Sequence, residues 1–98
     1  MTLMINDVNI TFIKPQNGLI GFASLILEDN FYIGSIGIHQ KLDGSGYRLT
    51  YPTKRINNQD LNIYHPINKA TSIAIEKAVI NKLKNVMNSV RYDSNNNE

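Results

Sequence analysis

The sequence predicts an α+β fold: an antiparallel β-sheet of four to five strands, followed by one long C-terminal helix packed on it. Before residue 65, apolar and polar side chains alternate in short runs that are separated by turn residues, as is typical of strands. From residue 69 onward the apolar residues recur with a helical period, and neither Pro nor Gly interrupts them. Because the sheet comes first and the helix last, the helix is expected to cover one face of the sheet.

Three strands are predicted in the first forty residues. The first spans about residues 4–14 and alternates as a half-buried strand does, with Phe12 on its apolar side. The sequence "PQNG" at 15–18 is strong turn chemistry, since its glycine accepts a positive φ. Residues 19–28 are the most apolar segment and indicate a central strand. Residues 31–38 follow a tight turn, and their two glycines predict a bulge or the close approach of another backbone.

The next segment is predicted to complete an antiparallel meander. The sequence "KLDGSG" at 41–46 indicates a flexible loop, and the alternating residues 47–51 indicate a fourth strand that Pro52 ends. A short fifth strand is expected near residues 61–64, where "INNQD" returns the chain as a hairpin. The pair that follows Pro52, Lys54 and Arg55, is then expected on a loop just past a strand end.

The helix is predicted to begin after Asn68, a favourable N-cap residue, with Pro66 limiting how the chain enters it. Glu76 lies near the apolar stripe; we expect it at the margin in solvent, and a buried or intersubunit ion pair is the alternative. The apolar stripe predicted to face the sheet consists of Ile73, Val79, Ile80, Leu83, Val86, Met87 and Val90.

Length and composition favour one globular domain over residues 1–92, with a disordered tail at 93–98. The chain has 98 residues, of which 42% are hydrophobic and 18% charged. It has no cysteine, which removes disulfides, thiolate metal sites and cysteine nucleophiles and fits a reducing compartment. No signal-peptide pattern and no apolar run of membrane-spanning length is evident, so a cytoplasmic location and no membrane association are expected.

Charge is distributed unevenly along the chain. The formal net charge is +2, but residues 1–46 hold two lysines against four acidic residues and residues 47–98 hold eight basic against four acidic residues. The second half therefore carries the excess of positive charge, which indicates an anionic partner for it. An ordinary solvated surface is the alternative explanation of the same pattern.

No pattern in the sequence predicts an enzyme, a cofactor or a metal site. The two histidines, His39 and His65, lie on different predicted elements. The metalloprotease, serine-hydrolase, P-loop and dinucleotide-binding patterns are all missing. Asp43 supplies a single carboxylate in a loop where a calcium site needs several.

Basic side chains on the predicted helix and beside the fourth strand are candidates for phosphate contacts. Lys77, Lys84 and Arg91 recur every seven residues and so share one side of the helix, with Lys82 and several asparagines beside them. Cations on a solvated helix surface are the plain alternative. Arg48 and the pair Lys54–Arg55 add charge at the end of the fourth strand. Three tyrosines have rings suited to stacking on unpaired bases, although packing in the core is the commoner use: Tyr47, Tyr51 and Tyr64.

The segments "ASLILEDNFYIGSIGI", "GYRLTYPTKR" and "IYHPIN", in this order, resemble the SpoVG family of septation and sporulation proteins. The resemblance covers roughly residues 8–90, and its most specific parts are Pro52-Thr53-Lys54-Arg55 and His65-Pro66-Ile67-Asn68. Asn62 departs from the aspartate usual in the family, and the loop at 41–46 is about two residues longer.

The resemblance implies a small α+β fold, a homodimer built partly through strand pairing, and a bacterial protein that binds DNA or RNA in septation, sporulation or other gene regulation. It places Lys54 and Arg55 at the family's basic pair and adds Lys69 to the helix cations that are candidate contacts. His65 and Pro66 match the His-Pro turn that precedes the helix in the family, which is called the elbow below. With Asn68 they are interpreted as structural residues that fix the start of the helix.

The function expected from these observations is that of a dimeric, nucleic-acid-binding regulator. The alternative is a protein-interaction module that acts through a sheet edge or a helix face, with no physiological nucleic-acid binding. The salt dependence of the binding constant distinguishes the two functions. Each phosphate contact adds about −0.9 to the slope of log affinity against log salt concentration, and an apolar contact does not.

Overall fold

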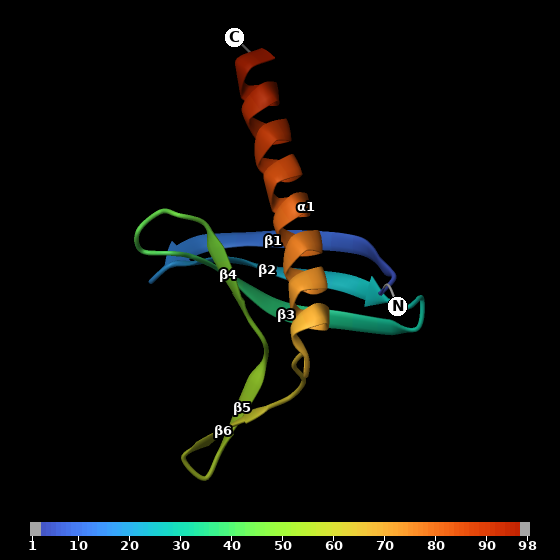
Figure 1. Ribbon diagram of the computed structural model, residues 1–98. Helices are drawn as coiled ribbons and strands as arrows, with labels where there is room; N and C mark the ends of the chain where they lie inside the picture. Colours follow the sequence, from blue (N-terminus) through green and yellow to red (C-terminus); the bar gives the residue numbers. More distant parts are fainter. Residues whose placement is uncertain (1–2, 97–98) are drawn as a thin grey trace.

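The computed structural model describes residues 3–96, and the side chains of residues 3–88. Its elements confirm the predicted α+β class (Figure 1). In chain order they are β1 (Ile5–Gln16), β2 (Leu19–Leu27), β3 (Phe31–Gln40), β4 (Tyr47–Thr50), β5 (Thr53–Ile56), β6 (Gln59–Asn62) and α1 (Lys69–Asn96).

Strands β1 to β4 form one antiparallel sheet in the order β1-β2-β3-β4. The β1–β2 turn uses Asn17 and Gly18, whose φ values of 52° and 92° suit a two-residue hairpin loop. Between β2 and β3 the register shifts from Ala23 opposite Ile36 to Leu25 opposite Ile33. This shift is the irregularity that the glycines of the third strand predicted, and Ser35 beside it has a φ of 60°.

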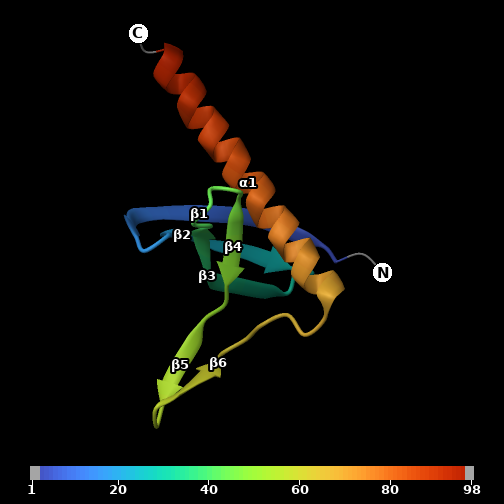
Figure 2. The ribbon, with the colours of Figure 1, turned by 60° about the vertical axis from the view of Figure 1, so that its left-hand side comes forward.

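Strands β5 and β6 form a separate two-stranded sheet. Its turn residues Asn57 and Asn58 have φ values of 51° and 66°, which a tight hairpin turn requires. The predicted return through "INNQD" is confirmed, but the returning strand lies at Gln59–Asn62 and does not extend the main sheet. The pair Lys54–Arg55 lies within β5, whereas a loop was expected there. The hairpin projects away from the main sheet (Figures 1 and 2).

The helix begins at a capped end. The side-chain oxygen of Asn68 accepts a hydrogen bond from the backbone N–H of Thr71 at 2.8 Å, as an N-cap residue does. From this point α1 crosses one face of the main sheet and continues past it (Figure 2). It ends at Asn96 in the structure, beyond the domain boundary predicted at residue 92; residues 97–98 lie outside the described part.

The core lies between α1 and the sheet. Helix residues spaced by four are buried against central-strand residues, which fixes the side of the helix that faces the sheet. The buried residues are Ala23, Leu25, Ile36, Ile38, Ile75, Val79 and Leu83, each at most 4% exposed.

Two assignments to the core from the sequence are wrong. Ile73 is 41% exposed and Ile75 takes its place, because the buried helix residues recur at four and not at seven. Phe12 is 44% exposed, because the part of β1 that packs against the core consists of Ile5, Val8 and Ile10. Glu76 is exposed, which confirms its expected place at the margin of the stripe.

The molecule is elongated. Its radius of gyration is 15.0 Å, compared with about 13 Å for a compact chain of this length. The β5–β6 hairpin and the C-terminal part of α1 extend in opposite directions from the sheet (Figure 1). Neither of these two parts of the described chain therefore packs against the main sheet.

Candidate nucleic-acid interface

Most of the basic side chains that were predicted from the sequence to contact phosphates lie on the helix. Between residues 69 and 88 it holds four lysines and a single glutamate. Lys69, Lys77 and Lys84 are exposed, and Lys82 is partly buried. In the described part of the chain the salt bridge that forms is Arg55–Asp60, so no helix lysine is neutralised by an ion pair there.

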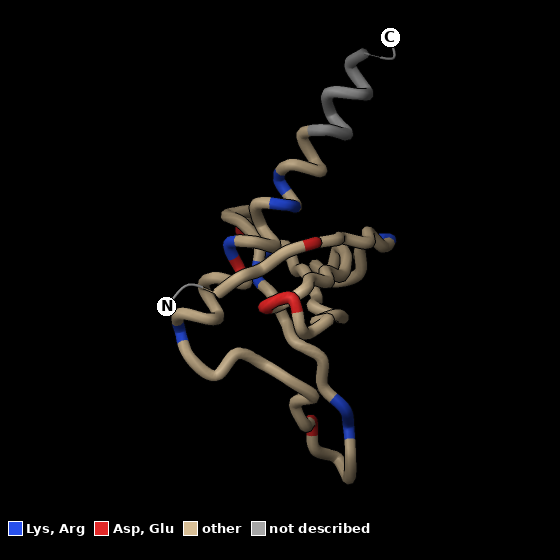
Figure 3. Tube along the Cα trace, turned by 90° about the vertical axis from the view of Figure 1, so that its right-hand side faces the viewer, with Lys and Arg blue, Asp and Glu red and all other residues tan. Residues whose placement is uncertain are grey.

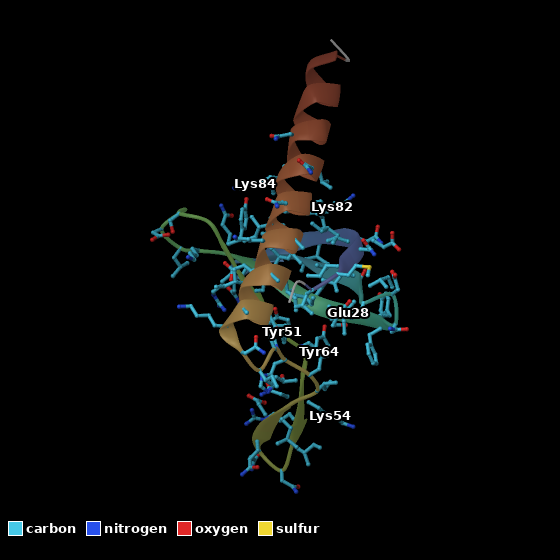
Figure 4. All side chains as sticks on the ribbon, turned by 45° about the vertical axis from the view of Figure 1, so that its right-hand side comes forward. Glu28, Tyr51, Lys54, Tyr64, Lys82 and Lys84 are labelled. Carbon is cyan, nitrogen blue, oxygen red and sulfur yellow. The ribbon has the colours of Figure 1, made fainter. Side chains whose placement is uncertain are left out.

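The helix lysines lie on two sides. Residues seven apart return to nearly the same side, so Lys77 and Lys84 share the surface turned away from the sheet. Lys82 is two residues from Lys84 and points about 200° away from it. Figure 4 shows Lys82 and Lys84 on opposite sides of α1. The side chain of Arg91 lies outside the described part.

A shallow depression of about 750 Å³ lies beside Lys82, between the helix and the start of β1. Asn81, Lys82 and Asn85 line its helix side, and Asp7 and Asn9 line its strand side. Asp7 has a φ of 53° and lies where the β1–β2 register shifts. Amide groups that donate and accept hydrogen bonds therefore surround one lysine in this depression.

Sequence reasoning missed the strand side of this depression. Asp7 and Asn9 are polar residues of an alternating strand, and alternation alone assigns them to solvent. Their approach to the helix results from the bulge in β1, which has no periodic signal in the sequence.

The hairpin holds a second, separate group of basic residues. Its register pairs Arg55 with Asp60, and the guanidinium Nη1 lies 3.1 Å from the carboxylate Oδ1. Lys54 is exposed and pairs across the strands with Leu61. Figure 3 shows the hairpin extending away from the sheet, and Figure 4 shows Lys54 beyond one edge of the sheet and Lys82 and Lys84 toward the opposite edge. One phosphate therefore cannot bridge the hairpin and these helix lysines within a single chain.

Arg48 lies on β4, away from both groups. The register places it opposite His39, whose Nε2 lies 3.0 Å from the Thr50 hydroxyl. Burial, and next the positive charge of Arg48, hold the pKa of His39 below its ordinary value. His39 is therefore neutral at pH 7, and Arg48 is the cation of this pair.

The elbow before the helix is held by Tyr64. Its hydroxyl donates a hydrogen bond to the Gly34 carbonyl, and its ring meets that of Tyr51 edge-on at 5.9 Å. His65 is exposed, with Nδ1 3.1 Å from the carbonyl oxygen of Pro66.

The three tyrosines considered for base stacking lie in packed positions. Tyr47, Tyr51 and Tyr64 are all partly buried against the core. Burial is the main reason why the pKa values of Tyr51 and Tyr64 are raised, that of Tyr64 to about 12. Their rings therefore hold the elbow and the edge of the core together.

Within residues 3–96 no group of three or more His, Cys, Asp or Glu is arranged to hold a metal ion. No helix in this part of the chain is long and apolar enough to cross a membrane.

The fold and these surfaces define a class: a small α+β protein with a basic helix laid over an antiparallel sheet and a projecting hairpin. Residues 3–85 match the SpoVG family, so the chain belongs to that family. It is similar to a SpoVG protein of Phytoplasma australiense whose name links it to septation. The two are 28% identical over 89 residues, which cover 89% of this chain and 90% of the relative. These matches confirm the resemblance noted in the sequence.

Proposed function

We propose that this SpoVG-family protein is a dimeric regulator that binds DNA or RNA and acts in septation or in gene regulation. The observation that carries the proposal is the helix, whose described side chains include four lysines with no salt-bridge partner among the described residues. Such an unpaired basic surface attracts a polyanion and releases counterions when it binds. The proposal includes no catalytic step.

Two surfaces of each chain contact phosphates in this proposal. Lys77 and Lys84 form the first, on the outer side of the helix; the second is the hairpin, where Lys54 and Arg55 extend from its two opposite faces. Since the helix surface and the hairpin lie toward opposite ends of the molecule, a single chain offers few contacts at either one. A two-fold dimer doubles both surfaces and increases the affinity of the assembly.

The hairpin supplies the argument for the dimer. Its register puts Ile56 and Leu61 on one face, together with Lys54, and the two apolar residues are 42% and 46% exposed. Ile63, just after β6, is 61% exposed. A two-stranded hairpin without further packing is marginal in water, so an apolar face of this kind needs a cover. A second copy of the chain is the proposed cover.

Fluorescence anisotropy tests the binding. Labelled duplex DNA, single-stranded DNA and RNA are titrated with the protein at low and at moderate salt. We expect binding that weakens steeply with salt, and a K77Q/K84Q variant should weaken binding to every sequence. Because the dimer then loses four lysines, the salt slope should fall by up to about 3.6 units. The matched control is K14Q, because Lys14 is an exposed lysine of β1 that belongs to neither surface. Absence of binding to all three probes at low salt would refute the proposal.

Sedimentation velocity tests the dimer. The wild-type chain should sediment as a dimer, and L61E should shift it toward the monomer. L42E is the matched control, because Leu42 is fully exposed on a loop outside the hairpin. A monomeric wild-type protein would remove the second copy from the proposal.

A second candidate function is supported by the same hairpin. Its exposed apolar face is also suited to a protein partner other than a second copy. Such a complex would form with little dependence on salt and would be lost in L61E but not in K77Q/K84Q. That pattern, together with absent nucleic-acid binding, would favour the interaction module.

A further inference from the structure

The main sheet has a second face, opposite to the helix. Alternation puts Ile36 and Ile38 toward α1, so the residue between them, Gly37, belongs to the other face. The register then puts Phe22 and Thr50, on either side of Gly37, on this same face. Figure 2 shows α1 against one side of the sheet only. No element of the described chain covers the outer face.

Two exposed aromatic side chains border a depression on this outer face. Phe22 is 39% exposed and Tyr32 is 73% exposed, and both line a depression of about 280 Å³. Tyr32 also lines the depression beside Lys82. The hydroxyl-bearing residues Thr11, Ser24 and Ser35 line the outer-face depression with the two rings. Two π faces and several hydrogen-bonding groups therefore surround one small space.

The depression coincides with the bulge between β2 and β3. The β2–β3 register omits Ser24, Gly34 and Ser35, although Ser24 pairs with Asn9 of β1. Ser35 adopts a φ of 60°, a conformation that a serine rarely takes and that is often found at binding sites. Tyr32 lies across Gly34, where a Cβ atom would come within 2.8 Å of its ring. Glycine at this position therefore leaves room for the ring.

A second depression lies at the other end of the same face and is basic. Lys41 and Arg48 line it together with His39 and Asn17, in a volume of about 440 Å³. Its carboxylate, that of Asp43, accepts a hydrogen bond from the Ser45 backbone N–H at 2.9 Å. Two cations against one acid leave a positive site that is suited to a phosphate.

The spacing of the two depressions fits a short single strand. Arg48 lies two strands and two residues away from Phe22, about 12 Å at ordinary sheet spacings. Between them, the Thr50 side chain lies over Gly37, where a Cβ atom would lie 2.5 Å from the Thr50 hydroxyl, so glycine leaves room for that side chain. A chain of a few nucleotides can span this distance along the face.

The polar character of this face argues against a second sheet as its cover. Sheets that pack face to face bury apolar residues on both inner faces. Here hydroxyl groups lie beside the two aromatic rings, and His39 and Arg48 lie at the other end of the face. Exposed rings among hydrogen-bonding groups and cations are the pattern by which proteins hold unpaired bases.

We propose that the outer face of the β1–β4 sheet binds single-stranded nucleic acid, with an unpaired base held at Phe22 and Tyr32 and a neighbouring phosphate at Lys41 and Arg48. This inference rests on the proposed function and adds to it the form of the ligand and a second binding surface. The helix and hairpin cations serve duplex and single strand alike, whereas the outer face selects the single strand.

The test compares labelled oligothymidylate, oligouridylate and a duplex of equal length. We expect F22A and Y32A each to weaken single-strand binding by about tenfold and to change duplex binding by less than about twofold. Y32F keeps the ring and should retain affinity. F31A is the matched control, because Phe31 is 63% exposed but does not line the depression. Ultraviolet cross-linking followed by mass spectrometry should place the linked base on Phe22 or Tyr32.

The outcomes separate this inference from the proposed function. Single-strand binding that is unchanged in F22A and Y32A would overturn the inference and leave the function intact. A wild-type protein that binds none of the three probes would overturn both. A change of oligomeric state in F22A or Y32A would identify the face as a contact between copies and would also overturn the inference.

Discussion

The hydroxyl group of Tyr64 donates a hydrogen bond to the backbone carbonyl of Gly34, thirty residues earlier in the chain. Strand β4 pairs with only the last four residues of β3, from Gly37 to Gln40, so no strand of the described residues lies beside the rest of that edge. Tyr64 occupies part of this edge and satisfies one of its carbonyl groups. The contact thereby fixes the segment that leads from the hairpin into the helix.

Removing this hydroxyl group should destabilise the fold without changing its shape. Y64F leaves the ring against Tyr51 but leaves the Gly34 carbonyl without its donor, so we expect the free energy of unfolding to fall by about 1 kcal/mol. Denaturant unfolding followed by circular dichroism measures the change. Y47F is the matched control, because the Tyr47 hydroxyl makes only a weak contact with the Met87 sulfur at 3.7 Å. Equal effects of the two variants would contradict the role given to Tyr64.

The raised pKa of Tyr64 predicts that the fold loses stability at alkaline pH. Burial raises the pKa of Tyr64 from 10.0 to about 12, so the unfolded chain loses this proton first. The contribution is fully present below pH 10 and is lost as the pH rises through about 12. Y64F should therefore show a smaller decline in the free energy of unfolding across this window. If both proteins decline in parallel, the raised pKa has no consequence for folding.

Two isoleucines on α1 provide a test of which side of the helix faces the sheet. Ile75 is 4% exposed and Ile73 is 41% exposed. We expect I75A to cost about 2–5 kcal/mol in the free energy of unfolding, because it leaves a cavity, and I73A to cost less than about 1 kcal/mol. Thermal or denaturant unfolding measures both. A larger cost for I73A would mean that the sequence-based stripe, and not the observed one, carries the core.

The error over Ile73 shows what the sequence could and could not predict here. The class, the order of strands before helix, and the hairpin turn at Asn57–Asn58 follow from alternation and turn chemistry, which act locally. The side of the helix that faces the sheet depends on where the chain enters it, and the apolar residues from Ile73 to Met87 fit more than one stripe. Only contact with Leu25 and Ile38 in three dimensions decides between these stripes.

The candidate site was predictable in its residue types but not in its geometry. The excess of lysine on the helix can be read from the sequence, as can the pair Lys54–Arg55. The hairpin pair and the helix lysines are far apart because the β5–β6 hairpin projects beyond one edge of the sheet, whereas Lys82 and Lys84 lie toward the opposite edge (Figure 4). Bulges in β1 and β3 likewise brought Asn9 and Ser35 to the edges of depressions, and a bulge breaks the periodicity on which sequence reasoning relies.

The cap of the helix gives a further measurable effect. N68A removes the acceptor of the Thr71 N–H and should cost about 1 kcal/mol in the free energy of unfolding. N68S keeps a hydrogen-bond acceptor at the same position, so it should lower the free energy of unfolding by much less than N68A does. Chemical unfolding of the two variants against the wild type makes the comparison. If N68S is as unstable as N68A, the capping hydrogen bond is not the source of the loss.

The ion pair of the hairpin yields a prediction in which removing a charge improves binding. Asp60 holds Arg55 in a pair whose side chains are 65% and 63% exposed, so D60N should change stability by less than about 1 kcal/mol. If Arg55 contacts a phosphate, freeing it should strengthen nucleic-acid binding at low salt and steepen the log–log salt slope by up to about one unit per chain. Anisotropy titrations across salt concentrations measure both quantities.

The control for this variant must change the net charge equally at a distance from the hairpin. D29N does so, because Asp29 lies in the turn between β2 and β3, where its carboxylate accepts a hydrogen bond from the Asn6 side-chain amide. A general electrostatic effect would raise affinity to the same extent in D29N and D60N. A rise confined to D60N assigns the hairpin to the nucleic-acid surface. Equal rises would remove it from that surface and leave the phosphate contacts to the lysines of the helix.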